Sequence, residues 1–288
     1  MGRILLNKQF LDDQNRSRDF HNLSMDDEKK LLEQFPDKKY FEFLHDCWIN
    51  RAERPLEKFE DRWANWKPWD IWSYPIDDLI RYRHMILDNS HLIKGYNVAD
   101  IGSHLGVGVL FSLNLGANRC VGVEPFEMKN TLASMICSKA GFENFNFITG
   151  ELKQKDIYQK ISDFDTLILG SLIDMIPDHY QLIENVSTTG IKNIIIEMED
   201  RKNADSETPD IEWQYFGNDH LRHGPLNLDK EKAIHGYPNL AFLKMLLGEF
   251  GYEFQKQVNF YVDTKSQKPR RRSVSTFTRL TDQKGMLI

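Results

Sequence analysis

Between residues 95 and 200, short apolar runs rich in β-branched residues alternate with segments of helical spacing. The runs are almost continuously apolar, as expected for parallel strands whose two faces are both covered. The predicted strands span Asn97–Ile101, Arg119–Val123, Phe145–Ile148, Thr166–Leu169 and Ile194–Met198, and the predicted helices span Val107–Leu115, Glu127–Ala140, Lys155–Ile161 and His179–Val186. This alternation predicts an α/β fold in which helices cover both faces of a mainly parallel sheet.

The C-terminal part completes this sheet. A helix is predicted over Leu240–Phe250, and two alternating strands are predicted over Phe254–Val262 and Ser273–Leu280. The basic turn Lys265–Arg272 would join these strands as an antiparallel edge pair. The intervening Glu212–Gly236 is predicted to be irregular. Together the strands predict a Rossmann-like, mainly parallel seven-stranded sheet with an antiparallel C-terminal edge strand pair.

Residues 1–90 are more polar, show helical spacing and hold four tryptophans between Trp63 and Trp72. They are predicted to form an N-terminal helical extension that caps the second domain, residues 91–288. Within that domain, residues 200–240 are predicted to be an insertion on the substrate side.

Composition excludes several classes of protein. The chain has 288 residues, is 41% hydrophobic and 28% charged, and carries a net charge of −6, which argues against disorder and against a surface devoted to nucleic acid. No apolar run approaches the roughly 20 residues that a membrane span needs. Cys47, Cys120 and Cys137 lie far apart, so neither a disulfide framework nor a metal site is expected. A cytoplasmic protein with reduced thiols is therefore predicted.

A glycine-rich turn follows the first predicted strand, in Asp100-Ile-Gly102-Ser-His104-Leu-Gly106. Glycine permits a left-handed backbone and close approach of a ligand, and the following helix N-terminus offers unpaired N–H groups. Glu124 ends the second predicted strand, 24 residues after Asp100. An acid at that place accepts hydrogen bonds from ribose hydroxyls in dinucleotide-type folds.

This combination resembles the class I S-adenosylmethionine-dependent methyltransferases, whose first motif is typically Asp/Glu-x-Gly-x-Gly-x-Gly. Asp100, Gly102 and Gly106 match it, and His104 stands where the middle glycine is common. The resemblance implies that the cofactor is S-adenosyl-L-methionine. It implies cofactor contacts by Asp100, Gly102, Ser103, His104, Gly106, Glu124, Pro125, Phe126, Glu151, Leu152 and Gly170.

The acceptor is expected to be a small molecule, held near Ser171 by the aromatic residues Trp69, Trp72 and Tyr74. The catalytic candidates are Asp174, His220 and His223, where a base would serve a hydroxyl acceptor. Asp178, His179 and His235 are further candidate bases.

Two alternatives stay open. One is a methyltransferase that modifies a tRNA or other RNA base, since Trp66-Lys-Pro-Trp-Asp70 resembles a stretch of enzymes that modify the tRNA wobble uridine, and the cluster Lys265–Arg272 could contact phosphate. The other is a catalytically inactive cofactor-binding protein of the same fold.

Overall fold

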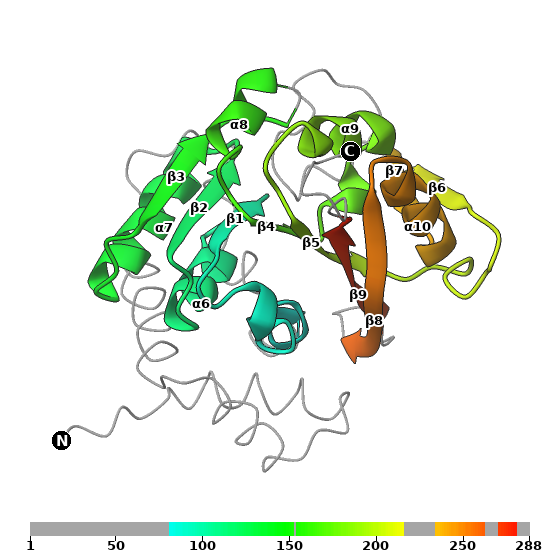
Figure 1. Ribbon diagram of the computed structural model, residues 1–288, viewed down its shortest axis with the longest axis horizontal. Coiled ribbons are helices and arrows are strands. Elements are labelled where there is room, and N and C mark those ends of the chain that lie inside the picture. The colour runs from blue at the N-terminus through cyan, green and yellow to red at the C-terminus, as the bar shows by residue number, and fades with distance from the viewer. Residues whose placement is uncertain (1–80, 153, 216–233, 263–269, 281–288) are drawn as a thin grey trace, which may run out of the picture.

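The computed structural model describes residues 81–152, 154–215, 234–262 and 270–280. Their largest sheet has seven strands: β1 (Asn97–Ile101), β2 (Arg119–Glu124), β3 (Phe145–Thr149), β4 (Thr166–Gly170), β5 (Asn193–Glu199), β8 (Tyr252–Val262) and β9 (Arg270–Arg279). They lie in the order β3-β2-β1-β4-β5-β9-β8 (Figure 1). The first five strands are parallel, and β9 runs antiparallel to both β5 and β8. The predicted Rossmann-like sheet with an antiparallel edge pair is confirmed.

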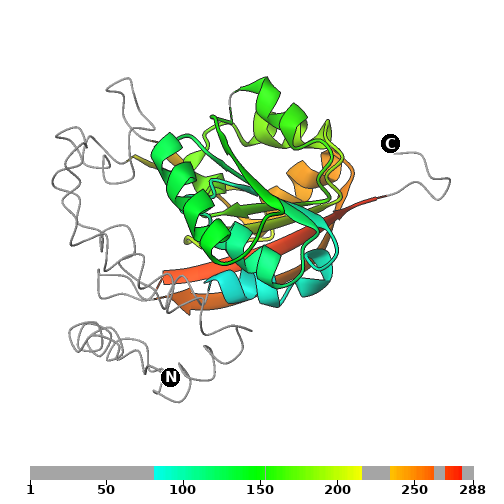
Figure 2. The same cartoon turned by 90° about the vertical axis from the view of Figure 1, so that its left-hand side faces the viewer.

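Helices cover both faces of this sheet (Figure 2). The elements on one face are the π-helical turn η1 (Arg83–Leu87), the 3-10 turn η2 (Ser90–Leu92), α6 (Val107–Asn114) and α7 (Glu127–Lys139). Those on the other are α8 (Lys155–Lys160), α9 (His179–Ser187) and α10 (Leu240–Glu249). The short turn η3 (Ile173–Met175) follows β4 and also contributes to the second face. Each predicted helix between residues 95 and 250 is present, with bounds that differ by a residue.

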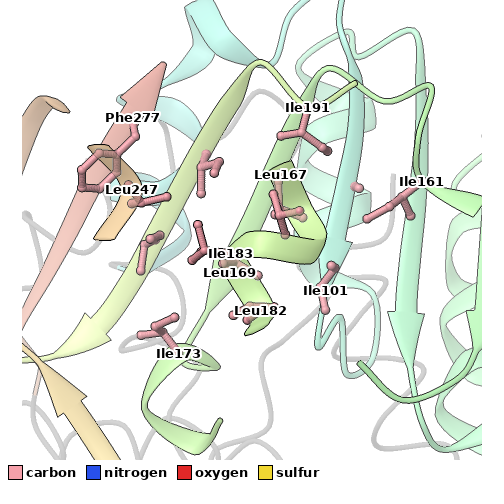
Figure 3. Close-up of a cluster of buried hydrophobic side chains, with 14 of the residues drawn as sticks. Ile101, Ile161, Leu167, Leu169, Ile173, Leu182, Ile183, Ile191, Leu247 and Phe277 are labelled. Atoms are coloured by element: carbon pink, nitrogen blue, oxygen red, sulfur yellow. The ribbon is translucent and has the colours of Figure 1, made fainter. Parts of the chain in front are cut away.

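The strands are nearly continuously apolar because alternate residues enter two different cores. Val98 and its register partner Cys120 pack with α6 and α7, whereas Ala99 and its partner Val121 pack toward α8 and α9. Figure 3 shows the second core, in which side chains of the central strands meet those of the covering helices. Its labelled members include Ile101, Leu167, Leu169, Leu182, Ile183, Leu247 and Phe277.

The two described cysteines belong to the first core. Cys120 and Cys137 are buried and free, and burial raises the pKa of the Cys137 thiol to about 12. Because the thiolate is the reactive form, both side chains act as small apolar groups.

The prediction that Glu212–Gly236 is irregular is wrong at both ends. β6 (Ile211–Tyr215) and β7 (Ile234–Pro238) form a separate two-stranded antiparallel sheet. The Trp213 ring lies over Gly236, where an added Cβ would come within 2.7 Å of the ring. A glycine in a short strand weakens the sequence signal, but here it makes room for the aromatic side chain of the partner strand.

No helix among the described residues is long and apolar enough to cross a membrane. In the same part of the chain, no group of three His, Cys, Asp or Glu side chains could hold a metal ion.

Candidate functional site

The glycine turn joins β1 to α6 at the carboxyl edge of the parallel strands. Gly102, His104 and Gly106 have positive φ values of 73°, 50° and 75°. The N–H groups of Gly102 and Ser103 donate to the Val123 carbonyl oxygen at 2.8 and 3.1 Å. A left-handed backbone costs conformational free energy for most residues other than glycine. His104 is the one non-glycine residue of this turn that adopts it.

Two glycines near this turn are required by the protein's own packing. A Cβ on Gly106 would lie 2.6 Å from the Phe147 ring, and one on Gly108 would lie 2.4 Å from Asp100 Oδ2. The Asp100 carboxyl group therefore packs against the first turn of α6. Burial, with the nearby charge of Glu124, raises the pKa of Asp100 to about 7. Asp100 therefore lies buried beside the start of α6, and a cation placed near it would favour its charged form.

Glu124 lies at the end of β2 with only 4% of its surface exposed. Its Oε2 accepts a hydrogen bond from the His104 backbone N–H at 3.2 Å, which links the second strand to the glycine turn. Lys129 Nζ lies 3.2 Å from Oε1, and burial lowers the pKa of this lysine despite the attraction of Glu124. Lys129 is thus the ionic partner of Oε1 among the described residues. A carboxylate can accept several hydrogen bonds, so Glu124 could also accept from a ribose hydroxyl, and the site fits an adenosine cofactor.

Several other predicted cofactor residues follow β2 and β3, the strands that end at Glu124 and Thr149. Pro125 and Phe126 are half-buried, and the Lys129 ammonium lies 4.7 Å from the centre of the Phe126 ring. The Gly150 N–H donates to the Glu124 carbonyl oxygen at 3.3 Å, which brings the segment after β3 beside β2. In that segment, Glu151 and Leu152 are half-buried.

Ser103 and Gly170 have a different environment from the one expected. Ser103 is buried, and its Oγ would lie 2.7 Å from a Cβ added to Gly122 in β2, so the hydroxyl points into the protein. A Cβ on Gly170 would lie 3.1 Å from Met85 Sδ, so this glycine makes room for η1.

A charged cluster lies beside Ser171, where β4 ends. Glu197, on β5, is completely buried, and Arg81 binds it through Nε at 3.1 Å and Nη2 at 2.9 Å. Arg272, on β9, also donates to Glu197. Both arginines donate to Ser171 Oγ, and Ser171 has a positive φ of 49°. Burial alone would raise the pKa of Glu197, but the charges of Arg272 and Arg81 hold it at about 2.

The roles of Glu197, Arg81 and Arg272 were not predicted from the sequence. A signal was present, because Glu197 interrupts the apolar run of a central strand that is buried on both faces. Buried acids are almost always paired, so this position calls for cationic partners.

The basic cluster Lys265–Arg272 is not simply a solvated turn, because Arg270–Arg272 belong to β9. Each of these three arginines has an acidic partner. Arg270 Nη1 lies 2.9 Å from Glu199 Oε2, Arg271 lies 3.0 Å from Asp200 and 2.5 Å from Asp205, and Arg272 binds Glu197. Much of the positive charge of this stretch is therefore neutralised within the protein.

Two of the candidate bases are brought together although they are 61 residues apart in the chain. Asp174 lies in η3 and His235 in β7, and Asp174 Oδ2 is 3.8 Å from His235 Nδ1. His179 has a supporting position, since its buried ring bonds the Ile173 carbonyl oxygen at 2.9 Å. Asp178 caps α9 by accepting from the Gln181 N–H at 2.9 Å.

The remaining predicted residues, Trp69, Trp72, Tyr74, His220 and His223, lie outside the described residues, as does nearly all of the predicted N-terminal extension.

No protein-family model and no curated protein sequence matches this chain. Solved structures do resemble it. The N-terminal domain of EvdMO1, solved with S-adenosylhomocysteine (SAH) bound, is 12% identical and superimposes with a TM-score of 0.56, covering 86% of this chain and 99% of that one. The Burkholderia thailandensis 1,6-didemethyltoxoflavin-N1-methyltransferase, solved with 1,6-didemethyltoxoflavin and SAH, is 13% identical with a TM-score of 0.52, covering 89% and 91%.

At these identities the likeness concerns the fold. The described chain has the class I S-adenosylmethionine-dependent methyltransferase fold, as the strand order and the antiparallel edge pair also indicate. A shared fold does not specify the acceptor, which has to be argued from the site.

Proposed function

We propose that this protein is an S-adenosylmethionine-dependent methyltransferase that acts on a small-molecule acceptor. The observation that carries the proposal is the buried Glu124 carboxylate at the end of β2, held beside the glycine turn by the His104 N–H and paired with Lys129. Two structurally similar proteins were solved with SAH bound, which supports the same cofactor here.

The cofactor residues are those around Glu124 and the glycine turn. Glu124 would hold the ribose, Phe126 and Glu151 would lie near the adenine, and Gly102 to Gly106 would hold the methionine part. Asp100 would balance the cofactor's ammonium group. When bound, S-adenosylmethionine supplies a methyl group on a sulfonium, and the protein's task is to orient the acceptor and exclude water.

The ion pairing of β9 favours a small acceptor over RNA. The cluster that would bind phosphate contains Arg270, Arg271 and Arg272, and each already has an acidic partner. Binding phosphate would require these pairs to be exchanged, which removes much of the electrostatic gain. Cys120 and Cys137, free and buried, suit the reducing conditions of a cytoplasmic enzyme.

Transfer of a radioactive methyl group from S-adenosylmethionine tests the function. We expect label in the small-molecule fraction of a cell extract and none in tRNA. If tRNA is labelled, and an Arg270→Ala, Arg271→Ala, Arg272→Ala variant weakens its salt-dependent binding, the acceptor is RNA. Cofactor binding without transfer to either fraction would indicate the catalytically inactive alternative.

A further inference from the structure

A carboxylate and an imidazole face each other beyond the carboxyl end of β4. Asp174 and His235 are each 13% exposed at the side chain, and their Oδ2 and Nδ1 atoms are 3.8 Å apart. The other Asp174 oxygen, Oδ1, is buried without a hydrogen-bond donor among the described residues. A buried carboxylate oxygen in this state stabilises any positive charge that forms beside it.

The fold holds both residues in place. β7 packs against η3. His179 Nε2 is hydrogen-bonded at 2.9 Å to the carbonyl oxygen of Ile173, the residue before Asp174. On the other side, the Trp213 ring covers Gly236, the neighbour of His235. The pair thus depends on the β6–β7 sheet, which lies apart from the seven-stranded sheet in the strand order.

The pair is also connected to the proposed cofactor turn. Leu172 lies two residues before Asp174, and its Cδ1 would be 3.2 Å from a Cβ added to Gly102. In open α/β sheets, ligands bind at the carboxyl ends of the strands, where the strand order reverses. In this sheet that place is between β1 and β4, the strands followed by Gly102 and by Asp174.

We infer that His235 is the general base for methyl transfer, that Asp174 positions it, and that the acceptor is a hydroxyl compound. The inference rests on the proposed function. The acceptor oxygen forms a bond to the methyl carbon while the carbon–sulfur bond breaks, and the sulfur keeps the electron pair as a neutral thioether. The hydroxyl proton passes to the His235 imidazole, whose positive charge Asp174 balances, and is then released to water.

Several other charged groups face the pair and enter its pH dependence. Besides burial, the charges of Arg201, Asp174 and Glu199 affect the pKa of the Tyr237 hydroxyl. Besides burial, the charges of Asp174 and Asp178 affect the pKa of His179. A change in the pH profile is therefore assigned to His235 only if His235→Gln removes it.

The test uses two probe acceptors, phenol and 4-nitrophenol, with labelled S-adenosylmethionine. Phenol is protonated at neutral pH and needs a base, whereas 4-nitrophenol above its own pKa is an anion and does not. We expect His235→Gln to lower the rate with phenol about 100-fold or more while the rate with the 4-nitrophenol anion is nearly unchanged. Asp174→Asn should give a smaller loss and move the limb of the phenol rate–pH profile that reports His235 to lower pH, because imidazolium loses its counter-charge.

His84→Gln is the matched control, since His84 also sits beside an aspartate, with Nδ1 2.7 Å from Asp88 Oδ2, but on η1. It should leave both rates unchanged. Equal rates of wild type and His235→Gln with phenol, or equal loss with both probes, would overturn the inference. Wild type that binds S-adenosylmethionine but methylates neither probe would overturn the hydroxyl assignment alone, whereas wild type that does not bind it would overturn the proposed function itself.

Discussion

Two buried carboxyl groups of this protein have opposite acid–base behaviour because of their neighbours. Burial, together with the nearby charge of Glu124, raises the pKa of Asp100 to about 7. Glu197 contacts two guanidinium groups, and its pKa is lowered to about 2. The two groups therefore change the free energy of unfolding with pH in opposite directions.

Asp100 makes the protein less stable as pH rises. Between about pH 4 and 7 the folded state keeps a proton on Asp100 that the unfolded state has lost, so unfolding releases a proton and becomes easier. The group's contribution falls by on the order of 4 kcal/mol across this window. Urea unfolding should show that the free energy of unfolding of Asp100→Asn, relative to wild type, is higher at pH 8 than at pH 5. A difference between the two proteins that stays constant with pH would contradict this assignment.

Glu197 contributes stability that is present above about pH 4.5 and lost as pH falls toward 2, because its folded pKa is depressed. Glu197→Gln should cost about 3–5 kcal/mol at neutral pH, since it leaves two partly buried guanidinium groups without their counter-charge. Glu199→Gln is the matched control, two residues further along the same strand. Its partners Arg270 and Arg201 are 45% and 22% exposed, so a loss of about 1 kcal/mol is expected from urea unfolding. Equal losses of stability in the two variants would contradict the claim that burial makes the Glu197 ion pairs the stronger ones.

At the scale of elements, one side chain links the start of α10 to the segment that leads into β6. Asn239 caps α10, and its Oδ1 accepts from the Phe242 N–H at 2.8 Å and the Asp210 N–H at 3.1 Å. Its Nδ2 donates to the Thr208 carbonyl oxygen at 2.8 Å. This residue is 1% exposed, so the groups that it binds cannot turn to water instead.

We therefore expect Asn239→Ala to cost about 2–3 kcal/mol, more than the ~1 kcal/mol of an ordinary helix cap. Asp178→Ala provides the comparison, because Asp178 is an exposed cap with one bond, to the Gln181 N–H at 2.9 Å. Hydrogen exchange in β6 and β7 should accelerate only in the Asn239 variant. If the two variants lose equal stability and exchange alike, Asn239 acts as a cap alone.

The five parallel strands, which are buried on both faces, were predictable from the sequence, whereas β6 and β7 were not. The five parallel strands lie within one or two residues of their predicted positions, because burial on both faces makes them continuously apolar. β7, with the sequence Ile-His-Gly-Tyr-Pro, lacks that signal and depends on packing between Trp213 and Gly236. The predicted basic turn overlaps β9 by three residues, because Arg270, Arg271 and Arg272 carry no apolar strand signal.

At the scale of the whole molecule, the part of the site formed by neighbours in sequence was predictable and the part formed across space was not. The glycine turn and Glu124 follow adjacent strands, so spacing along the chain indicates that they meet. Arg81 and Glu197 are 116 residues apart, and Arg272 and Glu197 are 75 apart. Neither contact follows from any local pattern, and the same holds for Asp174 and His235.

The central claim is that the carboxyl edge of this sheet binds S-adenosylmethionine through Glu124. Calorimetric titration of S-adenosylmethionine into wild type, Glu124→Ala and Glu127→Ala tests it most directly, since Glu127 is an exposed acid three residues further on. We predict micromolar binding, of the order of −8 kcal/mol, by wild type and Glu127→Ala, and a loss of at least 100-fold in Glu124→Ala. Absence of binding in wild type, or equal affinity in all three proteins, would contradict the claim.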